Sequence, residues 1–217
     1  MPYQPALLRI LHGLITALVI FALVSGFWVY NTYDQRWGQL PLPNLEDIQG
    51  IHGTGALTFL LLLPLFVIYS FHWGYRRLIQ PQAWQQLHKI GQPSSWAALQ
   101  KILNSVMLLA ATFAAITGRL MQEEWLPRGE LNHWAYGGHL LAWLVMLVAL
   151  ILHIGLGIKV GGVPLILSIV QIKIRPNDRL QRWLQGWRLT PSRLLLAWEI
   201  LIMGGIIAAF ILPVFSS

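Results

Sequence analysis

Residues 134–158 decide the fold, and they read WAYGGHLLAWLVMLVALILHIGLGI. The stretch contains no Asp, Glu, Lys or Arg, and about 20 apolar helical residues suffice to cross a hydrocarbon core about 30 Å thick. Its two histidines, His139 and His153, are 14 residues apart, which in an α-helix is a rise of about 21 Å and a rotation about 40° short of whole turns. We therefore expect a membrane-spanning helix with both imidazoles on one side, one near each leaflet.

Four more apolar runs of similar length occur along the chain, at residues 7–30, 51–73, 97–118 and 194–214. The 217 residues are 56% hydrophobic and 11% charged, with a mean hydropathy of +0.58, far from the composition of a soluble domain. The sequence predicts an all-α membrane protein with a four-helix transmembrane bundle and a fifth, C-terminal transmembrane helix.

We divide the chain into a four-helix core (1–158), a basic interfacial segment (159–193) and the fifth helix (194–217). Within the middle part, residues 177–189 place apolar and Trp side chains on one helical face and arginines elsewhere, which predicts an amphipathic helix on the membrane surface. A connector is the simpler interpretation of this helix, and a docking site for a partner is the alternative.

The basic residues predict the orientation of the chain. If the N-terminus is cytoplasmic, twelve of the 15 Lys and Arg residues lie in inner loops and helix ends, and only Arg36, Arg119 and Arg128 lie outside. This asymmetry follows the positive-inside rule and places the N-terminus in the cytoplasm. The net charge of +7 therefore reflects membrane topology, and we expect lipid but not nucleic acid as a partner.

The absence of cysteine narrows the redox chemistry that the chain can support. Without cysteine there are no disulfides, iron–sulfur clusters, thiolate zinc sites or covalent attachment of c-type haem. Histidine is then the ligand available inside the membrane. His12 lies in the inner part of the first span and His52 begins the second span on the outer side, so depth pairs His12 with His153 and His52 with His139.

Two imidazoles from different helices at one depth can bind an iron porphyrin as axial ligands, and two such layers would form an electron path. We therefore predict two haem b groups. Small residues that would leave helix surface open to a flat macrocycle flank each histidine: Gly13, Gly55, Gly138 and Gly155. The alternative is that the histidines form hydrogen bonds between helices and the glycines serve ordinary close packing.

Other polar residues in or near the spans receive supporting roles. Arg9 and Arg119 could pair with haem propionates, or anchor their helices at the interface. Helical phase turns His72 and His133 away from the four paired histidines, so we expect them to act as capping or hydrogen-bonding groups. Glu199, the acid inside the last span, could serve a proton route, but we favour neutralisation of Arg193.

The pattern resembles the di-haem membrane cytochrome b family, which includes the Ni,Fe-hydrogenase cytochrome b subunit, the formate dehydrogenase gamma subunit and the bacterial cytochrome b561 proteins. The resemblance rests on Arg9-x-x-His12, His52, Thr117-Gly118 and the His139/His153 pair. It implies the same ligand pairing. Where the formate dehydrogenase subunit has an asparagine of its quinone site, this chain has Ala97, although Gln100 and Lys101 remain.

From the resemblance we expect electron transfer across the membrane, between a redox partner of the dehydrogenase or hydrogenase type and the quinone pool. The chain would be an electron-transfer subunit of an oxidoreductase in a bacterial cytoplasmic or internal photosynthetic membrane, and it could form a homo-oligomer. One alternative is a free-standing quinone-linked oxidoreductase of small molecules. Another is a non-redox scaffold or anchor that binds partners through its basic inner face.

Overall fold

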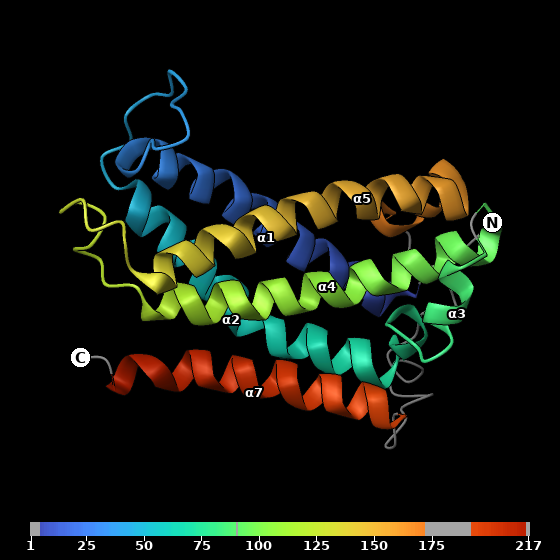
Figure 1. The fold of residues 1–217 in the computed structure, drawn as a ribbon. Coiled ribbons are helices and arrows are strands. Elements are labelled where there is room, and N and C mark those ends of the chain that lie inside the picture. The colour runs from blue at the N-terminus through green and yellow to red at the C-terminus, as the bar shows by residue number, and fades with distance from the viewer. Residues whose placement is uncertain (1–4, 90, 172–191, 216–217) are drawn as a thin grey trace.

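The computed structural model describes residues 5–89, 91–171 and 192–215, and in these ranges every regular element is helical. The long helices are α1 (Ala6–Tyr33), α2 (Ile48–His72), α4 (Pro93–Leu120), α5 (Trp134–Val170) and α7 (Arg193–Phe215). Between α2 and α4 lie a short 3-10 helix, η1 (Tyr75–Arg77), and a single turn and a half of helix, α3 (Ala83–Leu87). Figure 1 shows the five long helices running side by side.

Each of the five long helices has the length and composition of a membrane span, as the sequence predicts. They are apolar along most of their length, so lipid can solvate their outer faces while their own hydrogen bonds satisfy the backbone. The start of α7 and α3 lie at one end of the bundle, and the end of α7 lies at the other (Figure 1). The all-α membrane fold with a fifth, C-terminal helix is therefore confirmed.

The helices form a closed ring rather than a four-helix bundle with a loose appendage. α4 packs along α5, α5 contacts α1, and α1 packs along α2. Direct contact between α2 and α4 is slight, and α7 packs against both of them. The fifth helix therefore seals the side of the bundle on which α2 and α4 diverge.

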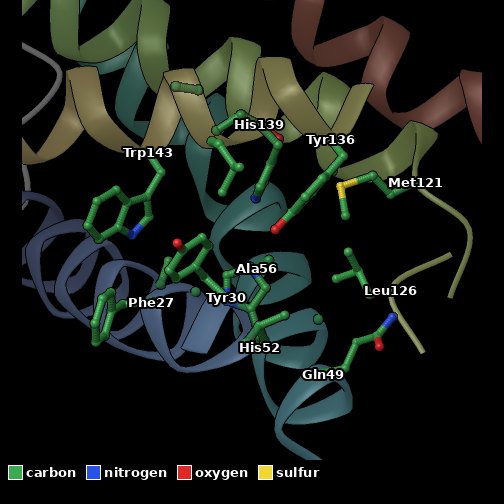
Figure 2. Close-up of a pocket in the computed structure, with 18 of the residues that line it drawn as sticks. Phe27, Tyr30, Gln49, His52, Ala56, Met121, Leu126, Tyr136, His139 and Trp143 are labelled. Carbon is green, nitrogen blue, oxygen red and sulfur yellow. The ribbon is translucent and has the colours of Figure 1, made fainter. Parts of the chain in front are cut away.

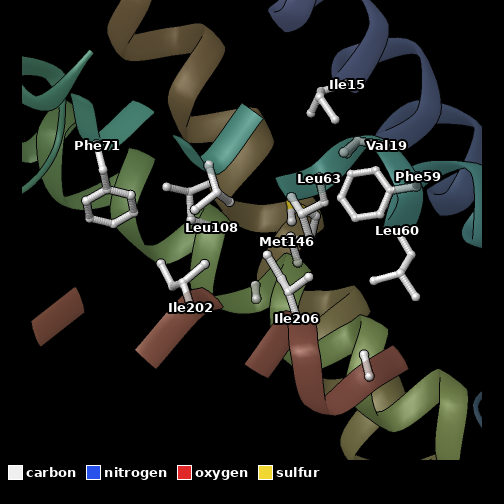
Figure 3. Close-up of a cluster of buried hydrophobic side chains, with 14 of the residues drawn as sticks. Ile15, Val19, Phe59, Leu60, Leu63, Phe71, Leu108, Met146, Ile202 and Ile206 are labelled. Carbon is white, nitrogen blue, oxygen red and sulfur yellow. The ribbon is translucent and has the colours of Figure 1, made fainter. Parts of the chain in front are cut away.

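The apolar core extends into α7. Ile202 and Ile206 of α7 are 0% and 1% exposed, and they belong to one cluster with Leu108 of α4 and Leu63 of α2. Figure 3 shows these side chains converging from their helices. Because the interior of a membrane protein gains stability from close packing rather than from exclusion of water, this contact makes α7 an integral part of the fold.

The fourth span is longer than the sequence predicts. Its helix continues past residue 158 to Val170, with a break at Gly162, where φ is 69° and ψ is 179°. Pro164 lacks the amide hydrogen that an unbroken helix needs there, and only glycine adopts this backbone conformation without strain. Residues 159–170 of the predicted interfacial segment are thus helical, and the amphipathic part at 177–189 lies outside the described residues.

Two adjacent glycines in α7 provide a test of its packing. A Cβ atom on Gly205 would lie 2.5 Å from Cγ2 of Thr112 on α4, whereas one on Gly204 would meet nothing within 4 Å. We expect Gly205→Val to lower the free energy of unfolding by about 1–3 kcal/mol more than Gly204→Val does, because only the first forces α7 away from α4. Thermal unfolding in detergent would measure both variants, and equal losses would show that α7 does not pack closely on α4.

Candidate functional site

The first histidine pair lies toward the end of the bundle where α1 ends and α2 begins. His52 comes from α2 and His139 from α5, with ring centroids 6.1 Å apart and ring planes 82° from parallel. Figure 2 shows His139 reaching from α5 into the pocket toward the side on which His52 lies. The two imidazoles that the sequence pairs by depth on the outer side therefore meet in the structure.

One nitrogen of each ring in this outer pair is engaged by a neighbouring helix. The Ser25 hydroxyl donates to the carbonyl of Phe21 at 2.7 Å, so it accepts a hydrogen bond from Nδ1–H of His52 at 2.9 Å. Nδ1–H of His139 donates to the carbonyl of Ala114 at 3.0 Å. This pattern assigns the hydrogen of both rings to Nδ1 and leaves Nε2 as a lone-pair donor, the form in which imidazole binds a metal.

The second pair lies toward the opposite end. His12 of α1 and His153 of α5 have ring centroids 6.2 Å apart, and their planes are 27° from parallel. These are the two histidines that the sequence pairs on the inner side. α5 thus supplies one ligand candidate to each layer, as the 14-residue spacing predicts, and the other two come from α1 and α2.

Asn104 decides which nitrogen of His153 carries the hydrogen. Its Nδ2 donates to the carbonyl of Arg77 at 2.8 Å, so its Oδ1 faces His153 and accepts from Nδ1–H at 2.9 Å. Gln100 Nε2 lies 3.0 Å from the same ring nitrogen, and at His12 the Thr16 hydroxyl lies 3.2 Å from Nδ1. Each of the four imidazoles therefore has a polar partner at Nδ1.

The separation of the ring centres in both pairs is close to that of two imidazoles that bind one metal from opposite sides. A metal bound by two imidazole nitrogens at about 2.0–2.1 Å, with each ring centre roughly 1.1 Å behind its nitrogen, separates the centres by about 6.3 Å. The observed separations are 6.1 and 6.2 Å. Among the described residues no group of three or more His, Cys, Asp or Glu could hold a bare ion. Two imidazole donors in each pair suit a porphyrin, which would supply its own four equatorial nitrogens.

A large cavity surrounds the outer pair. Its volume is about 1580 Å³, and its wall includes aromatic side chains of Phe27, Tyr30 and Trp143. Arg36 and Arg119, from the loop after α1 and the last turn of α4, also line it. An apolar chamber with a cationic edge suits a flat, largely apolar ligand that carries acidic groups at one side.

The predicted glycines divide into two kinds. A Cβ atom on Gly13 or Gly155 would meet nothing within 4 Å, so the helix surface there is open. A Cβ atom on Gly55 would overlap the ring of Phe21, and one on Gly138 would lie 3.2 Å from Thr117. Gly55 and Gly138 therefore permit close helix packing, which is the alternative that the sequence leaves open for them.

Two other glycines, which the sequence does not single out as contacts, lie against the outer rings. Added Cβ atoms on Gly26 and Gly118 would lie 3.2 Å from Cε1 of His52 and 3.1 Å from Cε1 of His139. Gly118 belongs to the Thr117-Gly118 signature, so a signal for it exists in the sequence. Gly26 has none, because its contact with His52 depends on how α1 packs against α2.

The remaining polar residues take other positions. Nη1 of the buried Arg9 donates to the carbonyl of Gln171 at 2.8 Å. Nε2 of His72 on α2 lies 2.8 Å from Oε1 of Glu199 on α7, which confirms the hydrogen-bonding role expected for His72. We expected Glu199 to pair with Arg193, but its partner in the structure is His72.

His133 also lies apart from the two pairs. It stacks on Trp125 at 3.7 Å and lies 3.3 Å from Glu130, and it lines the outer cavity.

A buried carboxylate closes the outer end of the site. The Asp34 side chain has no exposed surface, and it accepts hydrogen bonds from Arg36 Nε at 2.6 Å and from the Tyr136 hydroxyl at 2.7 Å. Burial raises the pKa of Asp34, but the hydrogen bonds from Arg36 and Tyr136 outweigh it, so the pKa lies below its ordinary value. This cluster ties the loop after α1 to the first turn of α5, three residues before His139.

We expect Asp34→Asn to lower the free energy of unfolding by about 2–3 kcal/mol at neutral pH, because it removes charged hydrogen bonds from a buried group. The folded pKa of Asp34 is depressed, so its carboxylate stabilises the protein above the unfolded pKa of about 3.9. That contribution disappears as the pH falls through the folded pKa. Acid destabilisation should therefore be shallower in the variant.

Denaturant unfolding in detergent, followed by Trp fluorescence over a range of pH, measures this effect. Glu124→Gln is the matched control, since Glu124 pairs with Arg128 at the surface, where both side chains are more than 60% exposed and the pair contributes little. If the two variants lost the same stability, Asp34 would not hold the outer end of the site together.

Comparison with protein families agrees with this geometry. The family model described as prokaryotic cytochrome b561 matches residues 3–170, which is more than half of the chain. No curated protein and no solved structure matches. Proteins of the matched family are membrane cytochromes b that carry electrons on haem in a four-helix transmembrane bundle. The chain belongs to the prokaryotic cytochrome b561 family.

Proposed function

We propose that this protein carries electrons across the membrane on two b-type haems, the inner one held by His12 and His153 and the outer one by His52 and His139. One observation carries the proposal. All four rings have a polar partner at Nδ1, and they meet in two pairs at the spacing that a shared metal requires.

Haem supplies a one-electron carrier, and the protein supplies its placement and its surroundings. The acceptors at Ser25, Ala114 and Asn104 hold His52, His139 and His153 in the metal-binding tautomer, and all four Nδ1 partners orient their rings. Between the two layers, the apolar cluster that includes Leu63, Leu108 and Ile206 keeps water and charge out of the middle of the bundle. Arg9 and Arg119 remain candidates for contacts with propionates at the inner and outer haem, and Gly13 and Gly155 for the open surface beside the inner one.

Charge supports a proposed orientation of the chain in the membrane, and family membership suggests the kind of partner. The excess of Lys and Arg on the inner side supports a cytoplasmic N-terminus in a bacterial cytoplasmic or internal photosynthetic membrane. We infer exchange of electrons between the quinone pool and a redox protein of the dehydrogenase or hydrogenase type. The basic residues of the proposed 159–193 segment are candidates for contact with such a partner, and the 1–158 core and the 194–217 helix complete the proposed organisation.

Haem counting tests the ligand assignment. We expect about two b-type haems per chain in the purified protein, and about one in His139→Ala or His153→Ala, because each substitution removes one axial ligand from one pair. A pyridine haemochrome assay together with the reduced-minus-oxidised spectrum measures this. His72→Ala is the matched control, because His72 lies in a span and contacts Glu199 but belongs to neither pair.

Retention of both haems in the His139 and His153 variants would overturn the proposed ligands. Unchanged haem content together with unchanged electron transfer would favour the scaffold alternative. A wild-type protein that reduces a small oxidant with quinol, and that copurifies with no redox subunit, would favour the free-standing oxidoreductase.

A further inference from the structure

The two histidine pairs share the same spacing but differ in the angle between their rings. The inner rings are 27° from parallel, whereas the outer rings are 82° from parallel and thus nearly perpendicular. Both pairs consist of two histidines, so the angle between the ring planes is the clearest difference between the two proposed pairs of haem ligands.

The hydrogen bonds at Nδ1 explain why the outer rings cross. A hydrogen bond from Nδ1–H lies close to the ring plane, so the position of its acceptor sets the rotation of the ring. His52 is held by Ser25 on α1, and His139 by the carbonyl of Ala114 on α4. These acceptors belong to different helices, and the close approach of Gly26 and Gly118 to Cε1 of each ring leaves little room for either to turn.

Ring orientation matters to iron through its d orbitals. When two axial imidazoles are parallel, both donate into the same iron dπ orbital, which separates that orbital in energy from its partner. When they are perpendicular, each donates into a different orbital and the two remain close in energy. A low-spin ferric ion then keeps orbital angular momentum and has a strongly anisotropic g tensor, and its oxidised state loses part of the stabilisation that parallel ligands provide.

Building on the proposed two-haem function, we infer that the outer haem is electronically distinct from the inner one, and that Ser25 is the positioning residue that sets its crossed ligand planes. The outer haem gives a strongly anisotropic low-spin signal, and the inner haem gives an ordinary rhombic one. The crossed geometry also raises the reduction potential of the outer haem above the value it would have with parallel rings, which favours electron flow from the inner haem to the outer.

Electron paramagnetic resonance of the oxidised, haem-loaded protein tests this directly. We expect two low-spin signals, one rhombic with three resolved features and one with a single feature at much higher g. In Ser25→Ala the high-g signal should shift toward the rhombic position, while the other signal stays unchanged. Ser25→Thr keeps the hydroxyl and should retain the wild-type spectrum.

Thr16→Val is the matched control at the inner pair. The Thr16 hydroxyl lies 3.2 Å from Nδ1 of His12, so this change should affect only the rhombic signal. Two rhombic signals from wild-type protein that contains two haems would overturn this inference and leave the proposed function intact. A haem content below two in the wild type would instead overturn the proposed function.

Discussion

The structure depends on the placement of four imidazoles in a medium that offers no water. A polar nitrogen in the hydrocarbon region costs several kcal/mol unless a partner satisfies it. Each of these rings meets that requirement at Nδ1 through a hydroxyl, a side-chain amide or a helix carbonyl. The opposite edge of each ring faces away from that partner, so the hydrogen bonds that satisfy the histidines inside the bundle are compatible with the proposed role as ligands.

Some of these partners come from helices that supply no histidine to that pair, and one comes from the helix that carries the histidine itself. α4 carries none of the four ligand candidates, yet its Ala114 and Asn104 orient the two rings of α5. The long contact between α4 and α5 is therefore as important for the site as the contact of α5 with α1, which carries His12. A change in the register of α4 by one residue would move both acceptors away from their rings.

The fifth helix extends a family whose core has four. The family match ends at residue 170, before α7, but α7 lies between α2 and α4 and contributes two almost fully buried isoleucines to the central cluster. The contact between His72 and Glu199 gives it a polar attachment one turn before Ile202. In this protein the wall that separates the two histidine layers from lipid on that side is built partly by the additional helix.

Much of the fold follows from local properties of the chain, and these properties are determined by the sequence alone. Hydropathy identifies all five spans, because each apolar run is long enough as a helix to cross the hydrocarbon core of the bilayer. Helical geometry places His139 and His153 on one side of one helix, and depth pairs them with His52 and His12. The tertiary structure decided which acceptor each Nδ1 meets, the crossing angle of the outer rings, the close approach of Gly26, the partner of Glu199 and the place of α7. These features depend on how neighbouring helices rotate and slide against each other, and that arrangement comes from packing between residues far apart in the chain, which the periodicity of a single helix does not specify.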